Sequence, residues 1–359
     1  MSDDGTREVR FKMEHYDLLM KCAKKRDMTE WNEWYRHYQL KRDSLSEDPG
    51  AYLDKAYLEN LNLEGVDLSK THLEYANLSN SVLNMANLSE ANLTGSHLNM
   101  ASLTGSNLTA ACLDDVVITS AHLEKTTLDK CSFNKSTMAD SHFQNAKMRN
   151  VKMQDAKLSG SHFEGADMKY GDLNGADLVS AYLEGTDLSN SDLRAANFEC
   201  SCLDGKTTLM GCTYNDKTDF TATAIASTRI EPDTLTALQK NIRKKYWNKW
   251  YDQHVNLQYP VRLFWWLSDY GTTCTRCIGA FVLLIIAAFV TYFWITGIAI
   301  PSSLELFADT ILATFGFGGL YDQLAGPVRL LLAAHVLAGY FLLAVLITRF
   351  AVMFQSLTP

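Results

Sequence analysis

A short segment near the C-terminus has residue types that favour a cation. Residues 314–318 read Thr-Phe-Gly-Phe-Gly and follow an apolar stretch, 304–313. Ser302 and Glu305 form a capping-box pattern at the start of this stretch, which predicts a short helix. The C-terminal end of a helix carries partial negative charge, and alternating glycines open backbone conformations that other residues avoid. We therefore expect this segment to bind a cation.

Two long uncharged segments flank these residues and would position them. Residues 277–298 are long enough to span a bilayer, and residues 330–348 form a second uncharged run. Basic residues precede the first run and follow the second, whereas the loop between the runs is acidic. This charge bias predicts an inner-membrane protein with two spans and both termini in the cytoplasm. Residues 258–271, aromatic and amphipathic, indicate an interfacial helix on the inner leaflet.

The order of span, short helix, T-x-G-F-G and second span resembles the pore domain of two-transmembrane potassium channels. The resemblance implies a homotetramer in which backbone carbonyls and the Thr314 hydroxyl replace the hydration shell of K⁺. It assigns the selectivity filter to Thr314, Phe315, Gly316, Phe317 and Gly318, the gating hinge to Gly339, and the pore helix and vestibule to Glu305 and Asp309.

Three residues depart from the commonest channel pattern, namely Ala313, Phe315 and Gly319. They permit weaker selectivity, so a non-selective cation channel is an alternative, as is a membrane-tethered binding scaffold that does not conduct. His335 could pair with Asp309 or pack within the second span, and the sequence does not separate these two roles.

The middle of the chain repeats every five residues. From Leu53 to Leu203, 31 consecutive blocks carry Leu, Ile, Phe or Met at the third position, and the first position is nearly always small. This period suits neither an α-helix, where the apolar residues would spiral, nor a flat strand, where they would alternate between faces. A coil that turns a corner every five residues buries one large and one small side chain at each corner.

This repeat resembles the pentapeptide-repeat family, with its A-(D/N)-L-x-x consensus. The resemblance implies an all-β right-handed quadrilateral β-helix with four blocks per coil, roughly 37 Å long at about 4.8 Å per coil. We expect it to be joined to an α-helical membrane domain with two transmembrane helices and a re-entrant pore helix. The expected domains are a helical leader and cap (1–50), the β-helix with its closing cap (51–220), a helical linker and interfacial helix (221–271) and the pore domain (272–359).

Aromatic segments and surface residues of the β-helix carry further predictions. Residues 31–37 resemble the Trp-Asn-x-Trp leader of this family and should cap the first coil, and residues 247–251 repeat this pattern. A stacking period of 20 places His122, His142 and His162 in an outward ladder. The ladder could sense protons or metal, but no acid recurs beside it at regular spacing, so we favour solvated surface histidines.

The late repeats are acidic, and one end of the β-helix should therefore attract cations. The residues concerned are Asp167, Asp172, Asp177, Asp187 and Asp192. Members of this family include DNA mimics that bind type II topoisomerases, which is a further alternative. The formal net charge of −8 argues against a nucleic-acid partner.

Other functional classes lack their motifs. No Ser-His-Asp or Cys-His arrangement, P-loop or dinucleotide fingerprint is present, so we expect no enzymatic activity and no cofactor. Cys274 and Cys277 could form half of a zinc site, but no second Cys or His pair lies nearby, and we expect no metal centre. The sequence therefore predicts a tetrameric potassium-type channel whose cytoplasmic repeat domain regulates gating through a ligand or protein that the sequence does not identify.

Overall fold

A computed structural model describes residues 11–253, 258–267, 275–296, 310–311, 314, 333–345 and 347. The chain forms two compact units, Met1–Leu238 and Gln239–Pro359, and each is described by itself.

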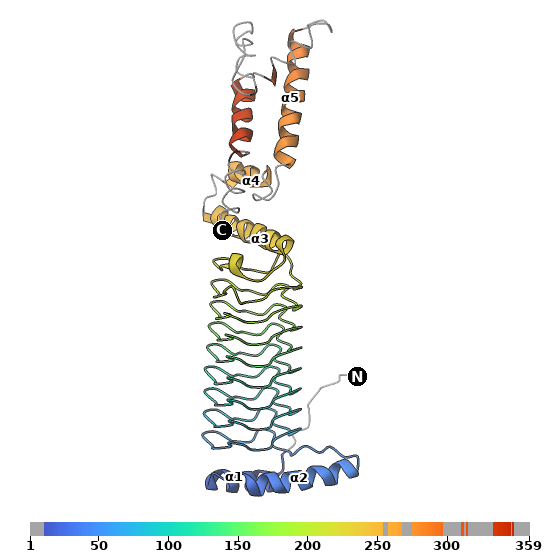
Figure 1. The fold of residues 1–359 in the computed structure, drawn as a ribbon, viewed down its shortest axis with the longest axis vertical. Coiled ribbons are helices and arrows are strands. Elements are labelled where there is room, and N and C mark those ends of the chain that lie inside the picture. The colour runs from blue at the N-terminus through green and yellow to red at the C-terminus, as the bar shows by residue number, and fades with distance from the viewer. Residues whose placement is uncertain are drawn as a thin grey trace, which may run out of the picture. The chain divides into compact units, whose positions relative to one another are not determined.

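The first unit contains a β-helix whose coils stack along one axis (Figure 1). Second-position residues pair in parallel with residues 20 positions later, from Tyr52 with His72 to Tyr182 with Cys202. Apart from the partly buried Leu61, first- and third-position side chains point inward and are buried. The rings of Phe143 and Phe163 stack with centroids 4.9 Å apart. The predicted pentapeptide-type β-helix with four blocks per coil is confirmed.

The corners depend on the fifth residue of each block. From Lys55 to Cys200, every fifth residue has a positive φ between 54° and 71°. The N–H of the next block returns to the carbonyl of the third residue, as in the 3.0 Å bond from Ala56 N to Leu53 O. A positive φ at the second central residue alone is typical of a type II turn.

Beyond Asp187 the spacing between paired residues lengthens. Asp187 pairs with Thr208, Asn197 with Asp219, and Thr208 in turn with Arg229. Residues 207–220, which we expected to form a closing cap, therefore build a further coil with longer corners. The short 3₁₀ helix η1 (Ile225–Ser227) and helix α3 (Pro232–Gln253) follow.

Two N-terminal helices, α1 (Met13–Lys25) and α2 (Thr29–Ser44), precede the β-helix. Trp31 of α2 is fully buried, and its Nε1 donates to the Asp67 carbonyl at 2.7 Å. Asn32 donates to the Gly65 carbonyl at 3.0 Å and accepts from the Asp67 N–H at 2.8 Å. The Trp-Asn-x-Trp leader thus forms hydrogen bonds with backbone groups that an uncapped first coil would leave exposed. This is the predicted cap of the first coil.

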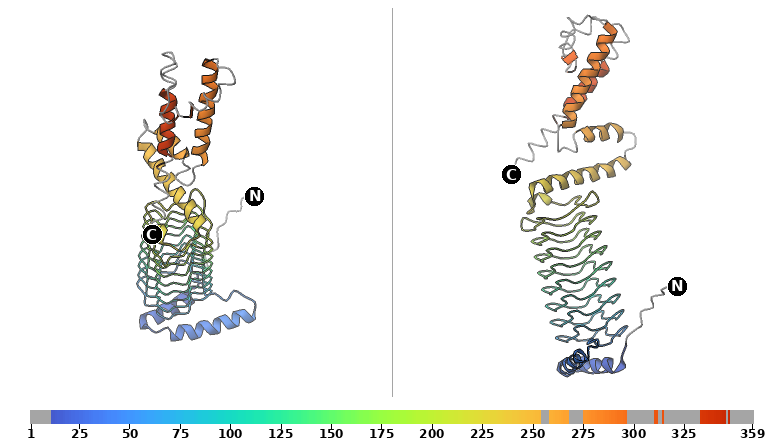
Figure 2. Two further views of the ribbon diagram at one scale, coloured as in Figure 1. Left: turned by 45° about the horizontal axis from the view of Figure 1, so that its top comes forward. Right: turned by 90° about the vertical axis from the view of Figure 1, so that its right-hand side faces the viewer.

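The second unit contains α4 (Gln258–Leu267), α5 (Thr275–Thr296) and helical residues 333–345 (Figure 2). Leu267, Leu342 and Val345 form a buried cluster with the partly buried residues Ala280, Phe281, Leu284 and Phe341. Within the residues described, no helix combines the length and the apolar character needed to cross a membrane. The two predicted spans, 277–298 and 330–348, both continue outside those residues.

Replacing Trp31 by alanine should lower the free energy of unfolding by about 3–5 kcal/mol, because the change opens a cavity and removes the donor to Asp67. Thermal melting of the full chain, followed by circular dichroism, measures this loss. Leu40 of the same helix is 64% exposed, so Leu40→Ala is a matched control that should change stability by less than about 0.5 kcal/mol. Equal effects of the two changes would show that α2 does not cap the first coil.

Candidate functional site

Of the five predicted filter residues, the structure describes Thr314. Phe315, Gly316, Phe317 and Gly318 lie outside the described residues. The same holds for other residues that the sequence singled out, namely Cys274, Glu305, Asp309, Ala313 and Gly319, and for the side chains of Cys277, Trp250 and Tyr251.

Thr310 and Thr314 are buried and helical, and Ile311 is helical and partly buried. The Thr314 hydroxyl donates to the Thr310 carbonyl at 2.8 Å and lies 2.7 Å from Nε2 of His335. Because the single hydroxyl proton is used in the bond to Thr310, Nε2–H of His335 is the donor in the second bond. This contact is neither of the two roles left open for His335, and Asp309 lies outside the described residues.

The predicted hinge residue, Gly339, contacts the backbone of Thr314. A Cβ atom at position 339 would lie 2.1 Å from the Thr314 carbonyl oxygen and 3.0 Å from its Cγ2. No larger residue fits here without movement of one backbone. Residues 333–345 thus hold Thr314 at two points one helical turn apart, His335 and Gly339.

The helix α5 leaves large apolar side chains exposed along much of its length. They are Ile278, Val282, Leu283, Ile286 and Val290. Exposed apolar patches of this kind mark contacts with lipid or with another protein.

The five predicted cation-attracting aspartates lie on faces of the β-helix, and three of them have a basic partner. Asp167 Oδ2 lies 2.7 Å from Arg149 Nε, Asp187 Oδ2 lies 3.0 Å from Lys169 Nζ, and Asp192 Oδ2 lies 2.5 Å from Arg194 Nη2. Their electrostatic field is therefore weaker than the sequence suggested.

These aspartates also support the coil itself. Each accepts a hydrogen bond from the N–H two residues later, as Asp172 does from Asn174 at 3.2 Å and Asp177 from Val179 at 3.3 Å. This is the turn-forming bond that favours Asp and Asn in such positions. The hydrogen bonds and the charge of Arg194 lower the pKa of Asp192.

The predicted histidine ladder is confirmed. The rings of His122, His142 and His162 stack with centroids 4.9 and 4.8 Å apart, and Tyr182 continues the stack at 4.3 Å. Burial, together with the two flanking histidines, lowers the pKa of His142.

The assumption that the ladder lacks acid partners was wrong. Nδ1 of His122 lies 2.9 Å from Glu124, and Nδ1 of His162 lies 2.9 Å from Glu164. Each acid follows its histidine by two residues, and the two acids lie 40 residues, or two coils, apart. Their place beside the ladder could therefore have been predicted from the sequence. In the described part of the chain, no three His, Cys, Asp or Glu side chains are placed to hold a metal ion.

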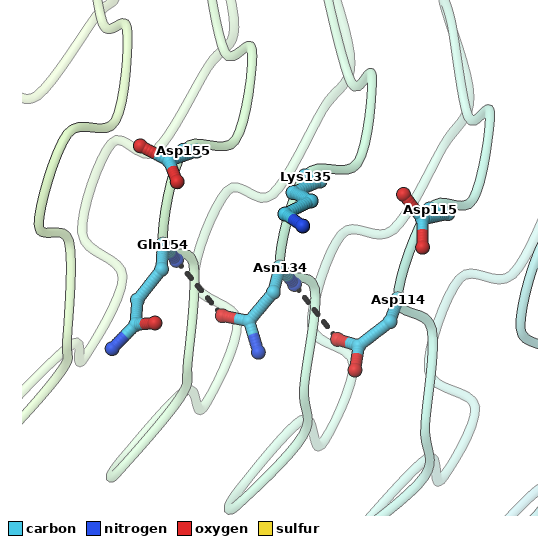
Figure 3. Close-up of a pocket in the computed structure, with 6 residues that line it drawn as sticks. All are labelled: Asp114, Asp115, Asn134, Lys135, Gln154 and Asp155. Carbon is cyan, nitrogen blue, oxygen red and sulfur yellow. Dashed lines mark hydrogen bonds between the residues drawn. The ribbon is translucent and has the colours of Figure 1, made fainter. Parts of the chain in front are cut away.

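An open cavity of about 300 Å³ on the β-helix is polar (Figure 3). Its lining includes the side-chain oxygens of Asp114 and Asn134, which accept the N–H groups of Asn134 and Gln154 at 2.9 and 3.0 Å. Asp115, Lys135 and Asp155 complete the lining. These bonds join successive coils, which gives the polar side chains a structural role.

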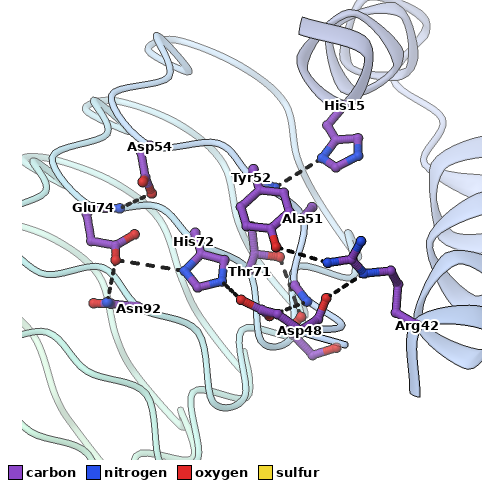
Figure 4. Close-up of polar contacts among 12 residues, drawn as sticks. His15, Arg42, Asp48, Ala51, Tyr52, Asp54, Thr71, His72, Glu74 and Asn92 are labelled. Carbon is purple, nitrogen blue, oxygen red and sulfur yellow. Dashed lines mark hydrogen bonds and ion pairs between the residues drawn. The ribbon is translucent and has the colours of Figure 1, made fainter. Parts of the chain in front are cut away.

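Sequence reasoning missed a titratable cluster between the N-terminal helices and the first coils (Figure 4). Nδ1 of the buried His15 accepts the Tyr52 N–H at 3.0 Å. Nε2 of His72 lies 2.6 Å from Asp48, and its Nδ1 lies 3.8 Å from Glu74. The separation of 20 between Tyr52 and His72 was visible in the sequence, whereas the position of His15 depends on how α1 docks.

The environments of the two histidines shift their pKa values in opposite directions. Burial, with a smaller effect of Lys12 and Arg42, lowers the pKa of His15 to about 4. The carboxylates of Glu74 and Asp48 raise the pKa of His72. His15 is therefore neutral at pH 7, and the folded state favours the charged form of His72.

These shifts predict that stability is greatest near pH 6.5. The neutral form of His15 stabilises the fold above its unfolded pKa of 6.5, and this contribution is lost as the pH falls towards 4. The contribution of charged His72 is complete below 6.5 and is lost as the pH rises above it. Thermal melting of the full chain between pH 4.5 and pH 8.5 tests both slopes.

His15→Asn keeps an acceptor for the Tyr52 N–H and removes the titrating ring. We expect this variant to lose less stability between pH 6.5 and pH 4.5 than the unchanged protein, by about 1.4 kcal/mol for each unit of the pKa shift. The exposed His37 provides the matched surface control, His37→Asn. An unaltered slope in His15→Asn would contradict the assignment.

Comparisons with known proteins agree with the repeat geometry. A family model described as pentapeptide repeats (8 copies) matches residues 50–84 and 86–124, and one described as pentapeptide repeat region matches residues 116–198. None of the matched residues lies in the predicted pore domain. Among curated proteins, none matches the chain.

Solved structures that are similar to the chain include two pentapeptide-repeat proteins and a plasmid-mediated fluoroquinolone resistance protein. HetL, involved in heterocyst differentiation regulation in the cyanobacterium Nostoc sp., is 23% identical, with 49% of this chain and 86% of HetL covered and a TM-score of 0.32. QnrB1, a plasmid-mediated fluoroquinolone resistance protein, is 16% identical, with 50% and 95% covered and a TM-score of 0.24. A thylakoid-lumen pentapeptide-repeat protein of Arabidopsis thaliana is 25% identical, with 33% and 72% covered and a TM-score of 0.19.

All three TM-scores are below 0.5, so these similarities carry no conclusion about ligands. The family models agree with the observed pairing of residues 20 positions apart. Residues 50–84 and 86–198 are therefore a region of pentapeptide repeats.

Proposed function

We propose that this protein is a tetrameric potassium-type ion channel of the inner membrane. K⁺ would be the permeant ion, and the channel would need no cofactor. The observation that carries the proposal is the burial of Thr314, the first residue of the T-x-G-F-G segment, against His335 and Gly339 of the second uncharged segment. In this arrangement a short helix and a flanking helix meet at the residue where a selectivity filter would begin.

The exposed apolar side chains of α5 support a membrane location. The charge bias of the sequence favours an orientation with both termini and the β-helix in the cytoplasm. In a tetramer these side chains would contact lipid or a neighbouring subunit. Gly339 would act as the gating hinge, and its close contact with Thr314 would link movement of residues 333–345 to the filter.

The β-helix would regulate gating through a ligand or protein partner and would not bind nucleic acid. Its acidic end would raise the local cation concentration, although the basic partners of Asp167, Asp187 and Asp192 reduce this effect. Asp172 and Asp177 are therefore the stronger candidates for attracting cations.

One alternative is a non-selective cation channel, because Phe315 and Gly319 differ from the usual filter residues. The other alternative is a tethered scaffold that does not conduct. Ion flux separates all three functions.

The full-length protein in liposomes, under opposing K⁺ and Na⁺ gradients, should show a reversal potential close to that of K⁺. Gly316→Ala should abolish the flux, because the added Cβ disturbs the backbone conformation that the filter needs. A reversal potential near zero would favour the non-selective channel. Absence of flux from the unchanged protein, and from a Gly339 variant biased towards opening, would favour the scaffold.

Neutralising Asp172 and Asp177 together as asparagines should lower the conductance in about 10 mM salt and leave it unaltered in about 1 M salt, where the Debye length falls to about 3 Å. Asparagine keeps the turn-forming bond, so the change removes charge alone. A conductance at low salt equal to that of the unchanged protein would contradict a role of the acidic end.

A further inference from the structure

We infer that the exposed face of α4, together with Arg276 at the start of α5, binds the phosphate of an anionic phospholipid. This inference rests on the membrane location in the proposed function, and it names the class of lipid that the protein recognises there. It is carried by the spacing and exposure of four side chains of α4 and by the contact between Trp266 and Arg276.

Four exposed residues form one stripe along α4. Counted from Tyr259, the others follow at three, four and seven residues, a spacing that places all four on the same side of a helix. Tyr259, Leu263 and Trp266 are 74%, 49% and 55% exposed, and Arg262 is exposed as well. Leu267, the next residue, belongs to the buried cluster of the second unit. The end of α4 is therefore anchored while the stripe remains accessible to a ligand.

The guanidinium group of Arg276 lies against this stripe. Its central carbon is 5.5 Å from the centroid of the Trp266 ring, and its Nη1 donates to the Trp266 carbonyl at 3.3 Å. The side chain of Arg276 is nevertheless exposed. A guanidinium group has five N–H donors in a planar fork, and a phosphate uses two of them in a bidentate contact. Arg262 and Arg276 thus supply two groups suited to a phosphate.

The neighbouring side chains favour a phosphate that is attached to a lipid. Neither α4 nor α5 contains an acidic residue, and the acid between these helices, Asp269, lies outside the described residues. Tyr and Trp are enriched at the level of the lipid headgroups. Ile278, two residues after Arg276, begins the exposed apolar row of α5. Basic, aromatic and apolar groups therefore lie together, as an amphipathic helix at an anionic membrane surface requires.

Equilibrium binding of fluorescent phosphatidylglycerol to the full chain, in an uncharged detergent, tests this inference. Unlabelled phosphatidylglycerol should displace the probe, whereas phosphatidylcholine and inorganic phosphate should displace little of it. Displacement by phosphatidylcholine at the same concentration would overturn the recognition of an anionic headgroup. Displacement by inorganic phosphate at the same concentration would show that a free phosphate is enough and would overturn the lipid as the ligand.

Replacing either arginine should weaken the binding. We expect Arg262→Gln and Arg276→Gln each to raise the dissociation constant about five-fold, the usual effect of one basic residue at an anionic membrane surface. Arg276→Gln also removes the bond to Trp266, so Arg276→Lys, which retains the charge, should recover part of the affinity. The matched control is Arg36→Gln, which removes an exposed arginine of α2 and should leave the binding unaltered. Equal weakening by Arg36→Gln would show an effect of net charge and would overturn the site.

Ion flux from liposomes that contain phosphatidylglycerol distinguishes failure of this inference from failure of the proposed function. A protein that conducts but binds phosphatidylglycerol no better than phosphatidylcholine would overturn the lipid site and leave the channel intact. Binding that depends on Arg262 and Arg276, in a protein that never conducts, would overturn the channel and leave the lipid site.

Discussion

The β-helix depends on one backbone requirement, the left-handed conformation of the fifth residue in each block. This residue turns the chain so that the N–H of the next block reaches the carbonyl of the third residue. Four such corners close one coil, and each block then lies beside the block 20 residues later. The buried column and the histidine ladder follow from this stacking.

The ends of the β-helix need other hydrogen-bond partners, because a terminal coil has no neighbouring coil on one side to pair with its backbone groups. At the N-terminal end, Trp31 and Asn32 bind backbone atoms of the coil that contains Gly65 and Asp67. Docking of these helices also buries His15, which is why its ring stays neutral. At the other end, longer corners carry the pairing as far as Arg229.

The second unit has no repeat to impose its geometry, and its site depends on individual contacts. Thr314 is held through a side-chain bond to His335 and a backbone contact with Gly339. The close contact with the Thr314 backbone is by itself enough to require glycine at position 339, whether or not the helix also bends there. A residue chosen from the sequence as a hinge has a second physical role in the folded chain.

The five-residue period by itself determined the inward residues, because a coil that turns one corner per block buries its apolar positions. The β-helix with four blocks per coil, and with it the period of 20 and the histidine ladder, was implied by the resemblance to the pentapeptide-repeat family. The sequence also pointed to Trp31 and Asn32 as the cap. It did not reveal the left-handed fifth position, where residues as different as lysine, tyrosine and glycine occur. Nor did it reveal the bond between Thr314 and His335, the burial of His15 or the basic partners of the aspartates. Apart from the pair Asp192 and Arg194, which lies within one block, those contacts join residues from different coils or helices, so they depend on distances that only the tertiary structure sets.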